Sequence, residues 1–515
     1  MKKINIDLTP EEYCIEPLMN ELVAKKLGVR TDDIAHIVVT RRSLDSRRGI
    51  RYHAEAEVYL KDEKFELPDY KSKYLNCENG RRIVIVGAGP AGVFAALRAL
   101  ELGLKPIIVE RGREVKRRKL DIAEMAREGV VNSDSNWCFG EGGAGTYSDG
   151  KLYTRSTKRG DVGEVLRKFV EHGAKREIMI DAHAHIGTDK LSKIIASTRE
   201  TILAHGGEYH FNTKMVDLIL NDDRVKGIVT DSGDRIEGDA VILATGHSAR
   251  DVYELFAKKG WKIEAKPFAM GVRVEHPQSL INSIQYHTKH YSKYLPPANY
   301  TLTTQVNGHG VFSFCMCPGG VIVPASTGLE QQVVNGMSNS LRNSPYANSG
   351  IAVTVSLEDV PEYAKYGELA LLRFQQAVEK RAYDITGGGL KAPCQKLTDF
   401  CNGKFSNKLN KSNYLGSCVA CRVDDILPKF VTKGLQQGFK DFDKKMHGFY
   451  TAEASVIAVE SRTSSPVRIP RDKETLQHVE LKGLYPCGEG AGYAGGIVSS
   501  AMDGMKCVDM IASEE

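Results

Sequence analysis

The sequence predicts an α/β fold built around a parallel sheet, because strands and a helix follow one another in a characteristic order. An apolar run, Arg82–Val86, enters a glycine-rich turn over residues 87–92. Apolar side chains then recur with helical spacing over Val93–Leu100. A second apolar run, Pro106–Val109, ends at Glu110. This order of strand, G-x-G-x-x-G turn, helix, strand and acid is typical of a Rossmann-like dinucleotide-binding unit.

Each part of this unit has a physical role in binding a dinucleotide. Gly87 makes the tight turn, Gly89 lets the backbone approach a pyrophosphate, and Gly92 lets helix and strand pack closely. The N-terminus of the following helix adds N–H groups and a positive dipole end. Glu110 can accept a hydrogen bond from a ribose hydroxyl, and its charge disfavours a 2′-phosphate. We therefore expect NAD or FAD here, and not NADP.

The chain before this unit, residues 1–80, is expected to form a small α+β module followed by a linker. Ile4–Leu8 is a predicted strand, and Thr9–Glu12 is a capping box that starts a helix ending at Gly28. Two further strands are predicted over Ile34–Arg41 and Arg51–Leu60.

Residues 81–255 are expected to form the first part of the nucleotide-binding domain. Helices are predicted over residues 161–173 and 190–206. Three strands over residues 214–220, 225–230 and 235–244 then predict a β-meander, which closes on the small-residue turn Ala244-Thr245-Gly246.

The second half of the chain is expected to hold an inserted domain and a return to nucleotide binding. Residues 256–449 mix strands, helices and glycine-rich turns, and we expect an inserted mixed α+β substrate domain. Residues 450–515 are expected to complete the nucleotide-binding domain. There Gly492, Gly495 and Gly496 permit close backbone approach, and a helix begins near Ile497. Its positive end would stabilise negative charge on a reduced flavin.

Composition limits the classes of protein that fit. The chain has 515 residues, 42% hydrophobic and 26% charged, with a net charge of +5. This length predicts several domains, and the small charge gives no indication of a nucleic-acid partner. No apolar run is long enough for a membrane span, and no signal-peptide core follows Met1, so we expect a cytoplasmic protein without a membrane partner. The 11 cysteines are expected to be reduced thiols.

Several segments together resemble a known class of flavoproteins. The GAGPAG turn with Glu110-Arg111, the meander closing on Ala-Thr-Gly, and the late segment over residues 488–497 resemble the FAD-binding domain of glutathione-reductase-like flavoproteins. Residues 139–146, 460–468 and 488–497 are more closely similar to the uncharacterised bacterial FAD-dependent dehydrogenases, often called NAD(FAD)-utilising dehydrogenases. The resemblance implies FAD as the cofactor and leaves the substrate open.

The resemblance also implies which residues meet the cofactor. The first glycine turn would line the pyrophosphate, Glu110, Arg111, Met215 and Val216 the adenosine end, and Thr245-Gly246 the adenosine or pyrophosphate. Gly488-Glu489 would meet the ribityl chain and pyrophosphate. The late glycines are expected to let the backbone approach the cofactor closely, and the glycine-rich loop over residues 142–146 is expected to lie over a phosphate or the isoalloxazine edge. The complete set is Gly87, Gly89, Pro90, Ala91, Gly92, Glu110, Arg111, Gly142, Gly143, Ala144, Gly145, Thr146, Met215, Val216, Thr245, Gly246, Gly488, Glu489, Gly492, Gly495, Gly496 and Ile497.

Catalytic residues are harder to assign from the sequence. His247 follows the Ala-Thr-Gly turn and is a candidate acid or base with a pKa close to working pH. Arg462 and Arg468 are candidates to clamp a carboxylate or phosphate, and Arg273 and Arg342 are weaker ones.

Other patterns have a structural and a functional interpretation. Cys315/Cys317 and Cys418/Cys421 have redox-like spacings but are expected to be buried thiols, and we expect no metal site. Lys116–Lys119 is a basic run that we expect to form a solvated helix face.

The sequence therefore predicts an FAD-dependent oxidoreductase. Hydride would pass between the flavin and either an unknown small-molecule substrate or NAD(P)H. Two alternatives remain open at this point: an FAD-dependent RNA-modifying enzyme and a non-catalytic flavin-binding module. The sequence does not indicate the direction of catalysis or the oligomeric state.

Overall fold

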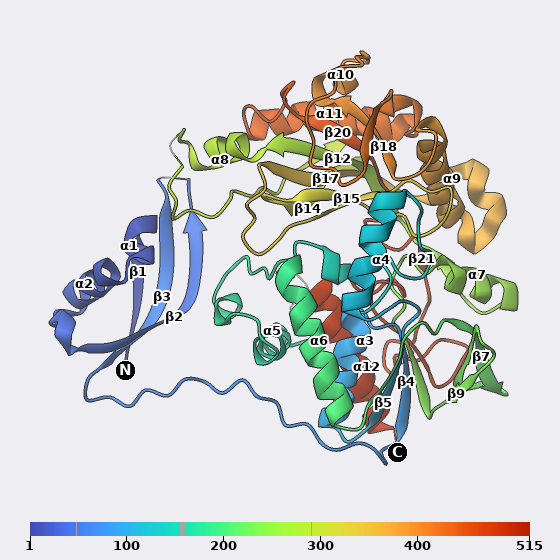
Figure 1. Ribbon diagram of the computed structural model, residues 1–515, viewed down its shortest axis with the longest axis horizontal. Helices are drawn as coiled ribbons and strands as arrows, with labels where there is room; N and C mark the ends of the chain where they lie inside the picture. Colours follow the sequence, from blue (N-terminus) through green and yellow to red (C-terminus); the bar gives the residue numbers. More distant parts are fainter. Residues whose placement is uncertain (48, 155–159, 290, 515) are drawn as a thin grey trace.

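The computed structural model describes the whole chain except residues 48, 155–159, 290 and 515 (Figure 1). Its centre is a five-stranded parallel sheet in the order β22-β10-β4-β5-β6. The strands are β4 (Arg82–Val86), β5 (Lys105–Val109), β6 (Glu208–His210), β10 (Ala240–Leu243) and β22 (Leu484–Pro486). The predicted strand, turn, helix and strand around the GAGPAG segment are confirmed, and so is the Rossmann-like α/β fold.

Successive side chains of β4 point to opposite faces of this sheet, and both faces are buried. Ile83 and Ile85 pack on one face against α3 (Pro90–Glu101) and α12 (Ile497–Ser513). Val84 and Val86 pack on the other face, where they meet α7 (Arg250–Lys259) and the meander. Beside α3 and α12 lie α5 (Val162–Glu171) and α6 (Thr188–Ala204), whose apolar side chains form a further cluster with α12. A strand in a sheet that is covered on both sides has a nearly continuous apolar sequence, and β4 has such a sequence.

The meander differs from its prediction in its third strand. It consists of β7 (Met215–Asn221), β8 (Arg224–Thr230) and β9 (Arg235–Glu237). The predicted strand over residues 235–244 is two strands, because the chain turns at Gly238-Asp239 and re-enters the parallel sheet as β10. A Cβ atom at Gly238 would lie 3.0 Å from the carbonyl oxygen of Arg82 on β4, so the chain passes close to β4 at this turn.

A second, seven-stranded sheet dominates the other half of the molecule, in the order β13-β14-β17-β12-β20-β18-β19. Its strands are β12 (Phe268–Pro277), β13 (Thr303–Val306), β14 (His309–Cys317), β17 (Tyr346–Val355), β18 (Lys391–Lys396), β19 (Ser417–Ala420) and β20 (Ser455–Glu460). Its helices are α8 (Gln278–Tyr286), α9 (Ala370–Ile385), α10 (Leu397–Cys401) and α11 (Lys429–Lys445), and Figure 1 shows this layer above the parallel sheet.

Strand β20 lies beyond the predicted domain boundary at residue 449. It pairs with β12 and β18 inside the seven-stranded sheet, so this sheet extends to Glu460. The division into four segments otherwise stays a prediction. Short strand pairs complete this half: β11 (Glu264–Ala265) with β21 (Val467–Arg468), and β15 (Val321–Pro324) with β16 (Val334–Met337).

The N-terminal module is a three-stranded antiparallel sheet with two helices. It contains β1 (Lys2–Leu8), α1 (Pro10–Cys14), α2 (Glu16–Leu27), β2 (Ile34–Asp45) and β3 (Arg51–Leu60). The capping box at Thr9 is confirmed, but the single predicted helix is interrupted at Ile15, where the backbone is extended. Arg42 on β2 forms an ion pair with Asp181 in the body of the molecule. A long extended segment leads from β3 to β4 (Figure 1).

No helix in the described part of the chain is long and apolar enough to span a bilayer.

Helices α3 and α12 pack with almost no space between their backbones. A Cβ atom at Gly504 of α12 would lie 2.0 Å from the carbonyl oxygen of Ala91, in the first turn of α3. Gly504 therefore fixes how closely the C-terminal helix approaches the glycine turn.

We expect Gly504→Ala to destabilise the protein although alanine favours helix formation. Overpacking costs about 1–3 kcal/mol, whereas the gain in helix propensity is about 1 kcal/mol. Urea unfolding followed by circular dichroism should therefore show a lower midpoint for Gly504→Ala. Lys506→Ala, at an exposed position of the same helix, is the control and should change the free energy of unfolding by less than about 0.5 kcal/mol. An unchanged midpoint for Gly504→Ala would contradict the close packing.

Candidate cofactor-binding site

A cavity of about 350 Å³ lies between the parallel sheet and the seven-stranded sheet. The carboxyl ends of four parallel strands open onto it, through Val86, Val109, Ala244 and Cys487. β14 contributes the facing wall. Ligands of open α/β sheets bind at the carboxyl ends of the strands, and this volume is within the roughly 300–1,000 Å³ of small-molecule sites.

Two glycines of the first turn are required by the protein itself. Gly87 has a φ of +109°, and a Cβ atom there would lie 2.4 Å from the carbonyl oxygen of Ala244. A Cβ atom at Gly92 would lie 2.0 Å from the carbonyl oxygen of Gly87. These two glycines therefore hold β4, β10 and α3 in close contact.

Gly89 and Gly495 have no such internal reason to be glycine. Gly89 has an ordinary φ of −77°, and a Cβ atom there would have its nearest neighbour, Cα of Gly143, at 3.9 Å. A Cβ atom at Gly495 would have no neighbour within 4 Å. Both residues line the cavity. At these two positions a side chain would project into space that the protein leaves open, which is the space a ligand needs.

Two helix N-termini point their free N–H groups at this cavity. Helix α3 begins with Pro90, which has no N–H, and continues with Ala91. Helix α12 begins after Gly496, and Ile497, Val498 and Ser499 of its first turn line the cavity. The first N–H groups of a helix have no intrahelical partner, and the helix dipole favours negative charge there. The cavity is thus suited to a ligand with two separate electron-rich groups.

Glu110 has a structural task that the sequence did not indicate. Its Oε2 accepts from the backbone N–H of Ala88 at 2.9 Å, and its Oε1 from those of Gly112 (2.9 Å) and Gly140 (3.0 Å). An ionised carboxylate has about four acceptor sites. Three of these acceptor sites hold loops together. The predicted contact with a ribose hydroxyl would use the fourth site and stays a prediction.

The basic run at residues 116–119 lies on α4 (Val115–Glu128) and is only partly a solvated face. The expectation was wrong for Arg118, which is fully buried. Its guanidinium donates to the carbonyl oxygens of Asn136 (2.8 Å), Glu141 (2.7 Å) and Gly143 (2.9 Å). Arg118 therefore holds the glycine-rich loop over the cavity. Its spacing of three from buried Val115 and of seven from buried Met125 was the available sequence signal.

His247 and Glu489 face each other in the cavity wall, with Nε2 and Oε2 3.5 Å apart. Burial and the charges of Arg462 and Arg250 lower the pKa of His247 to about 4. The expectation of a pKa close to working pH was therefore wrong. Burial raises the pKa of Glu489 to about 7. Histidine is thus neutral here, and the carboxyl group is the one that titrates near neutral pH.

Arg462 lines the cavity, but its guanidinium is already fully engaged. It pairs with Glu379 at 3.1 Å and also donates to Thr327 (2.7 Å) and Gln331 (2.8 Å). Burial would raise the pKa of Glu379, but the charges of Arg250 and Arg462 outweigh it and lower that pKa to about 2. Arg462 is therefore a fixed charge in the wall and has no donor group left over that would clamp a ligand.

The remaining candidate arginines lie elsewhere. Arg468 is on β21, outside the residues that line the cavity. Arg273 is fully buried and paired with Glu460 at 2.6 Å, and Arg342 pairs with Asp149. None of these three is placed to bind a ligand in this cavity.

The wall contributed by the seven-stranded sheet includes an irregular segment of β14. The register of β14 against β17 shifts between Phe314 and Cys317, and Cys315 has a φ of +42°. Both Cys315 and Cys317 line the cavity. Cys317 is buried, but Cys315 is exposed at the cavity wall, so the expectation of a buried thiol was wrong for Cys315. Desolvation by the surrounding protein nevertheless raises the pKa of Cys315 to about 12, so this group is a protonated thiol at neutral pH.

Most of the residues predicted to meet the cofactor line this cavity. They are Gly87, Gly89, Pro90, Ala91, Glu110, Arg111, Gly143, Ala144, Gly145, Met215, Thr245, Gly246, Gly488, Glu489, Gly495, Gly496 and Ile497. Five do not line it, namely Gly92, Gly142, Thr146, Val216 and Gly492. Val216 is 41% exposed, and Thr146 is buried and bonded to the Glu141 carbonyl within the glycine-rich loop. Direct cofactor contact by each lining residue stays a prediction.

The sequence analysis missed several residues of the wall, including Lys151, Tyr153, Phe314 and Asn335. Lys151 and Tyr153 follow the glycine-rich loop within a few residues, which was a usable signal. Phe314 and Asn335 reach the cavity only through tertiary packing.

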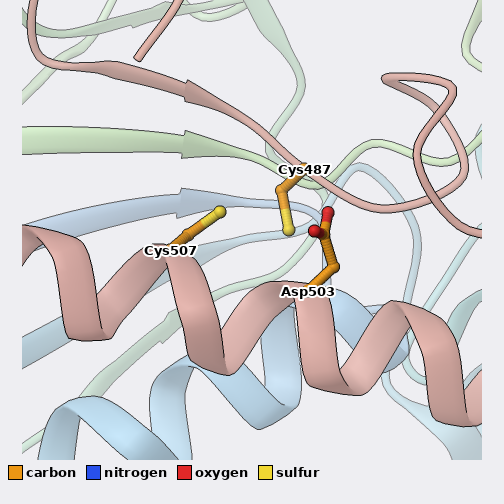
Figure 2. Close-up of side chains that lie close together, drawn as sticks. All are labelled: Cys487, Asp503 and Cys507. Carbon is orange, nitrogen blue, oxygen red and sulfur yellow. The ribbon is translucent and has the colours of Figure 1, made fainter. Parts of the chain in front are cut away.

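Figure 2 shows a cluster of Cys487, Asp503 and Cys507 beneath the late glycine turn, with their ligand atoms within 4.8 Å of one another. Arg471 forms a bidentate ion pair with Asp503 at 2.6 and 3.0 Å. Asp503 also accepts from the backbone N–H of Gly488 at 2.8 Å. A guanidinium thus neutralises the carboxylate, and the cluster positions Gly488 at the cavity. Cys418 and Cys421, by contrast, lie outside the residues that line the cavity.

Comparisons with known proteins agree with this geometry. Residues 267–463 match the family model "FAD-dependent protein, C-terminal domain-like", and residues 1–59 match a domain of unknown function. An uncharacterised protein of Clostridium beijerinckii is 39% identical over 99% of this chain and 98% of its own length. The chain therefore belongs to the same family as that protein. The match over residues 267–463 identifies it as an FAD-dependent flavoprotein; membership of the NAD(FAD)-utilising dehydrogenases stays a prediction.

Solved structures resemble the chain more weakly. The crystal structure of CtdE in complex with FAD is 11% identical and covers 84% of both chains, with a TM-score of 0.33. A geranylgeranyl bacteriochlorophyll reductase-like protein from Thermoplasma acidophilum is 14% identical, covers 84% of this chain and 77% of its own, and has a TM-score of 0.34.

The pKa of Glu489 leads to a prediction about FAD affinity. The pyrophosphate of FAD stays doubly negative between pH 6 and 8, whereas Glu489 becomes ionised as the pH rises through about 7. His247, the partner of Glu489, remains neutral over this range. FAD affinity should therefore fall with rising pH, on the order of tenfold for two like charges in a partly buried site.

Fluorescence titration with FAD at pH 6, 7 and 8 measures this effect. Glu489→Gln keeps the side chain neutral and should remove the pH dependence. Glu254→Gln, on α7 and outside the cavity lining, should leave the wild-type slope unchanged. If the FAD affinity of Glu489→Gln depended on pH as strongly as that of the wild type, the assignment of this pH dependence to Glu489 would be contradicted.

Proposed function

We propose that this chain, a member of the family of the Clostridium beijerinckii protein, is an FAD-dependent oxidoreductase. In this proposal hydride passes between the bound flavin and a small-molecule substrate, or between the flavin and NAD(P)H. The observation that carries the proposal is the open space above Gly89 and Gly495, between two helix N-termini. A Rossmann-like turn with ligand space at its second glycine is the pattern that a dinucleotide cofactor requires.

The chain's own residues can hold such a cofactor along the cavity. The N-terminus of α3 and Gly89 would bind the pyrophosphate, and Arg111 and Met215 would contact the adenosine portion. Gly488 would lie against the ribityl chain, and the N-terminus of α12 would favour negative charge on the flavin ring. When bound, FAD supplies hydride acceptance and donation at its isoalloxazine ring. The protein supplies position, charge and exclusion of water.

The substrate would bind against the wall formed by the seven-stranded sheet. Phe314, Cys315 and Asn335 come from this sheet or from the hairpin packed on it, and they line the same cavity as the glycine turns. A substrate enclosed between the two sheets would be shielded from water. Lining residues from both sheets surround one space, so the inserted segment completes the site that the parallel sheet begins.

NAD(P)H has no separate Rossmann unit of its own in the described part of the chain. The segments over residues 140–145 and 490–495 match G-x-G-x-x-G by letter. The first is followed only by the 3-10 turn Gly143–Tyr147, and the second only by α12 near the end of the chain. A nicotinamide donor would therefore have to enter the substrate side of the same cavity.

The test of the proposed function is whether the protein takes up FAD and exchanges electrons through it. Purified protein reconstituted with FAD should show a flavin absorption band, and anaerobic NADH, NADPH or a substrate should bleach it. Failure of FAD to bind would overturn the proposal.

Gly89→Val is the matching variant, because it tests ligand space without straining the backbone. The φ of −77° suits valine, and the nearest heavy atom to its Cβ would be 3.9 Å away. We expect an unchanged circular dichroism spectrum and a loss of FAD affinity of at least a hundredfold, since the side chain fills space that the pyrophosphate needs. Wild-type affinity for FAD in this variant would show that the cofactor lies elsewhere.

A further inference from the structure

Lys151 differs from every other charged residue in the wall of the cavity. It follows the glycine-rich loop and is half-buried, and its ammonium donates to the backbone carbonyl of Met316 on β14. It thereby links the nucleotide-binding half of the molecule to the seven-stranded sheet at the substrate side. The bond to Met316 places the ammonium near the preceding residue, Cys315, where its charge offsets part of the rise in thiol pKa that desolvation causes.

Each of the other ionised groups of the wall that the structure describes has an ion-pair or hydrogen-bond partner of its own within the protein. Arg111 pairs with Asp251 at 2.7 Å, and Arg462 pairs with Glu379 at 3.1 Å. Asp149 accepts from Arg342 at 2.9 Å and also from Ser338. Glu110 accepts three backbone N–H groups, and Glu489 faces His247.

Lys151, in contrast, has no carboxylate within ion-pair distance in the described part of the chain. Its one hydrogen-bond acceptor is a neutral carbonyl oxygen. A half-buried ammonium without a counter-ion is poorly stabilised. A ligand with one negative charge would supply the counter-ion and form a charge-assisted hydrogen bond with it.

The groups around Lys151 indicate what kind of ligand this is. Asn335 lines the same cavity, and its Oδ1 accepts from Gly336 (2.7 Å) and Arg273 (3.3 Å). Its amide NH₂ is therefore the end left to donate to a ligand. Phe314, two positions before Met316, and Tyr153, two positions after Lys151, add aromatic surface to the wall of this cavity. One cation, an amide donor and aromatic surface fit a carboxylate on an apolar body.

We infer that the substrate of this chain is a small organic carboxylate and that Lys151 binds its carboxylate group. The inference rests on the proposed function, because it names the substrate class of the same site. A single ammonium balances the single charge of a carboxylate, whereas a phosphate dianion would leave one charge unbalanced. Lys151 is thus assigned as a substrate-binding residue.

The experiment uses FAD-loaded protein and follows the flavin absorption spectrum during ligand titration. The probes are benzoate and 3-phenylpropanoate, each with its neutral amide, and inorganic phosphate as a separate arm. We expect the carboxylates to cause saturable spectral changes, and their affinity should fall when salt is added. The amides should bind at least tenfold more weakly. Equal binding of carboxylate and amide to the wild-type protein would overturn the inference. Tighter binding of phosphate than of either carboxylate would overturn the choice of carboxylate.

Variants of Lys151 test its role directly. Lys151→Met should weaken carboxylate binding at least tenfold while the affinity for FAD stays unchanged, and Lys151→Arg should restore most of it. Lys119→Met, exposed on α4, is the matched control. Unchanged carboxylate binding in Lys151→Met would overturn the inference. If Lys151→Met folds poorly, the comparison of carboxylate with amide in the wild type still decides. Failure of the proposed function has a different signature, which is the absence of FAD uptake.

Discussion

The rest of the structure depends on close backbone contact at the carboxyl ends of the parallel strands. Gly87 lies against the carbonyl of Ala244, the residue that follows β10, Gly92 lies against Gly87 itself, and Gly504 of α12 lies against Ala91. The contact of Gly504 with Ala91 brings together segments that are about 400 residues apart in the chain. Because a Cβ atom at any of the three glycines would come within 2.4 Å of a backbone oxygen, the geometry of the cavity follows from their lack of a side chain.

Buried charged side chains hold the loops that these contacts leave exposed to the cavity. Arg118 donates to four carbonyl groups around the glycine-rich loop, and Glu110 accepts three N–H groups from the neighbouring turns. Asp503, paired with Arg471, holds the N–H of Gly488. A buried charge is costly unless its hydrogen bonds are satisfied. Each of these three satisfies backbone groups that a loop cannot satisfy alone, so the cavity is preformed by the protein itself.

The sequence predicted the parts of the site that local pattern determines, and it failed where tertiary packing decides. The G-x-G-x-x-G unit, the capping box at Thr9 and the start of α12 depend on residues close together in the chain, and all were found. The pKa of His247 depends on Arg462, which is 215 positions away, so a normal value was wrongly expected. Arg118 lies at helical spacing from buried apolar residues, but its basic neighbours obscured this pattern. Phe314 reaches the cavity only because two sheets face each other.

The charges of the wall indicate what kind of chemistry this cavity can support. Arg250 and Arg462 share one carboxylate, Glu379, so this buried cluster keeps a net positive charge beside His247. Burial, together with the charges of this cluster, holds His247 neutral, and Cys315 is neutral because desolvation at the cavity wall raises the pKa of its thiol. Neither group is therefore an effective base at neutral pH. The protein's contribution is a positive, preorganised surface for electron-rich groups, and burial raises the pKa of Glu489, which lines the same cavity, to about 7. A reaction on this surface should follow the ionisation of a carboxyl group and not that of an imidazole.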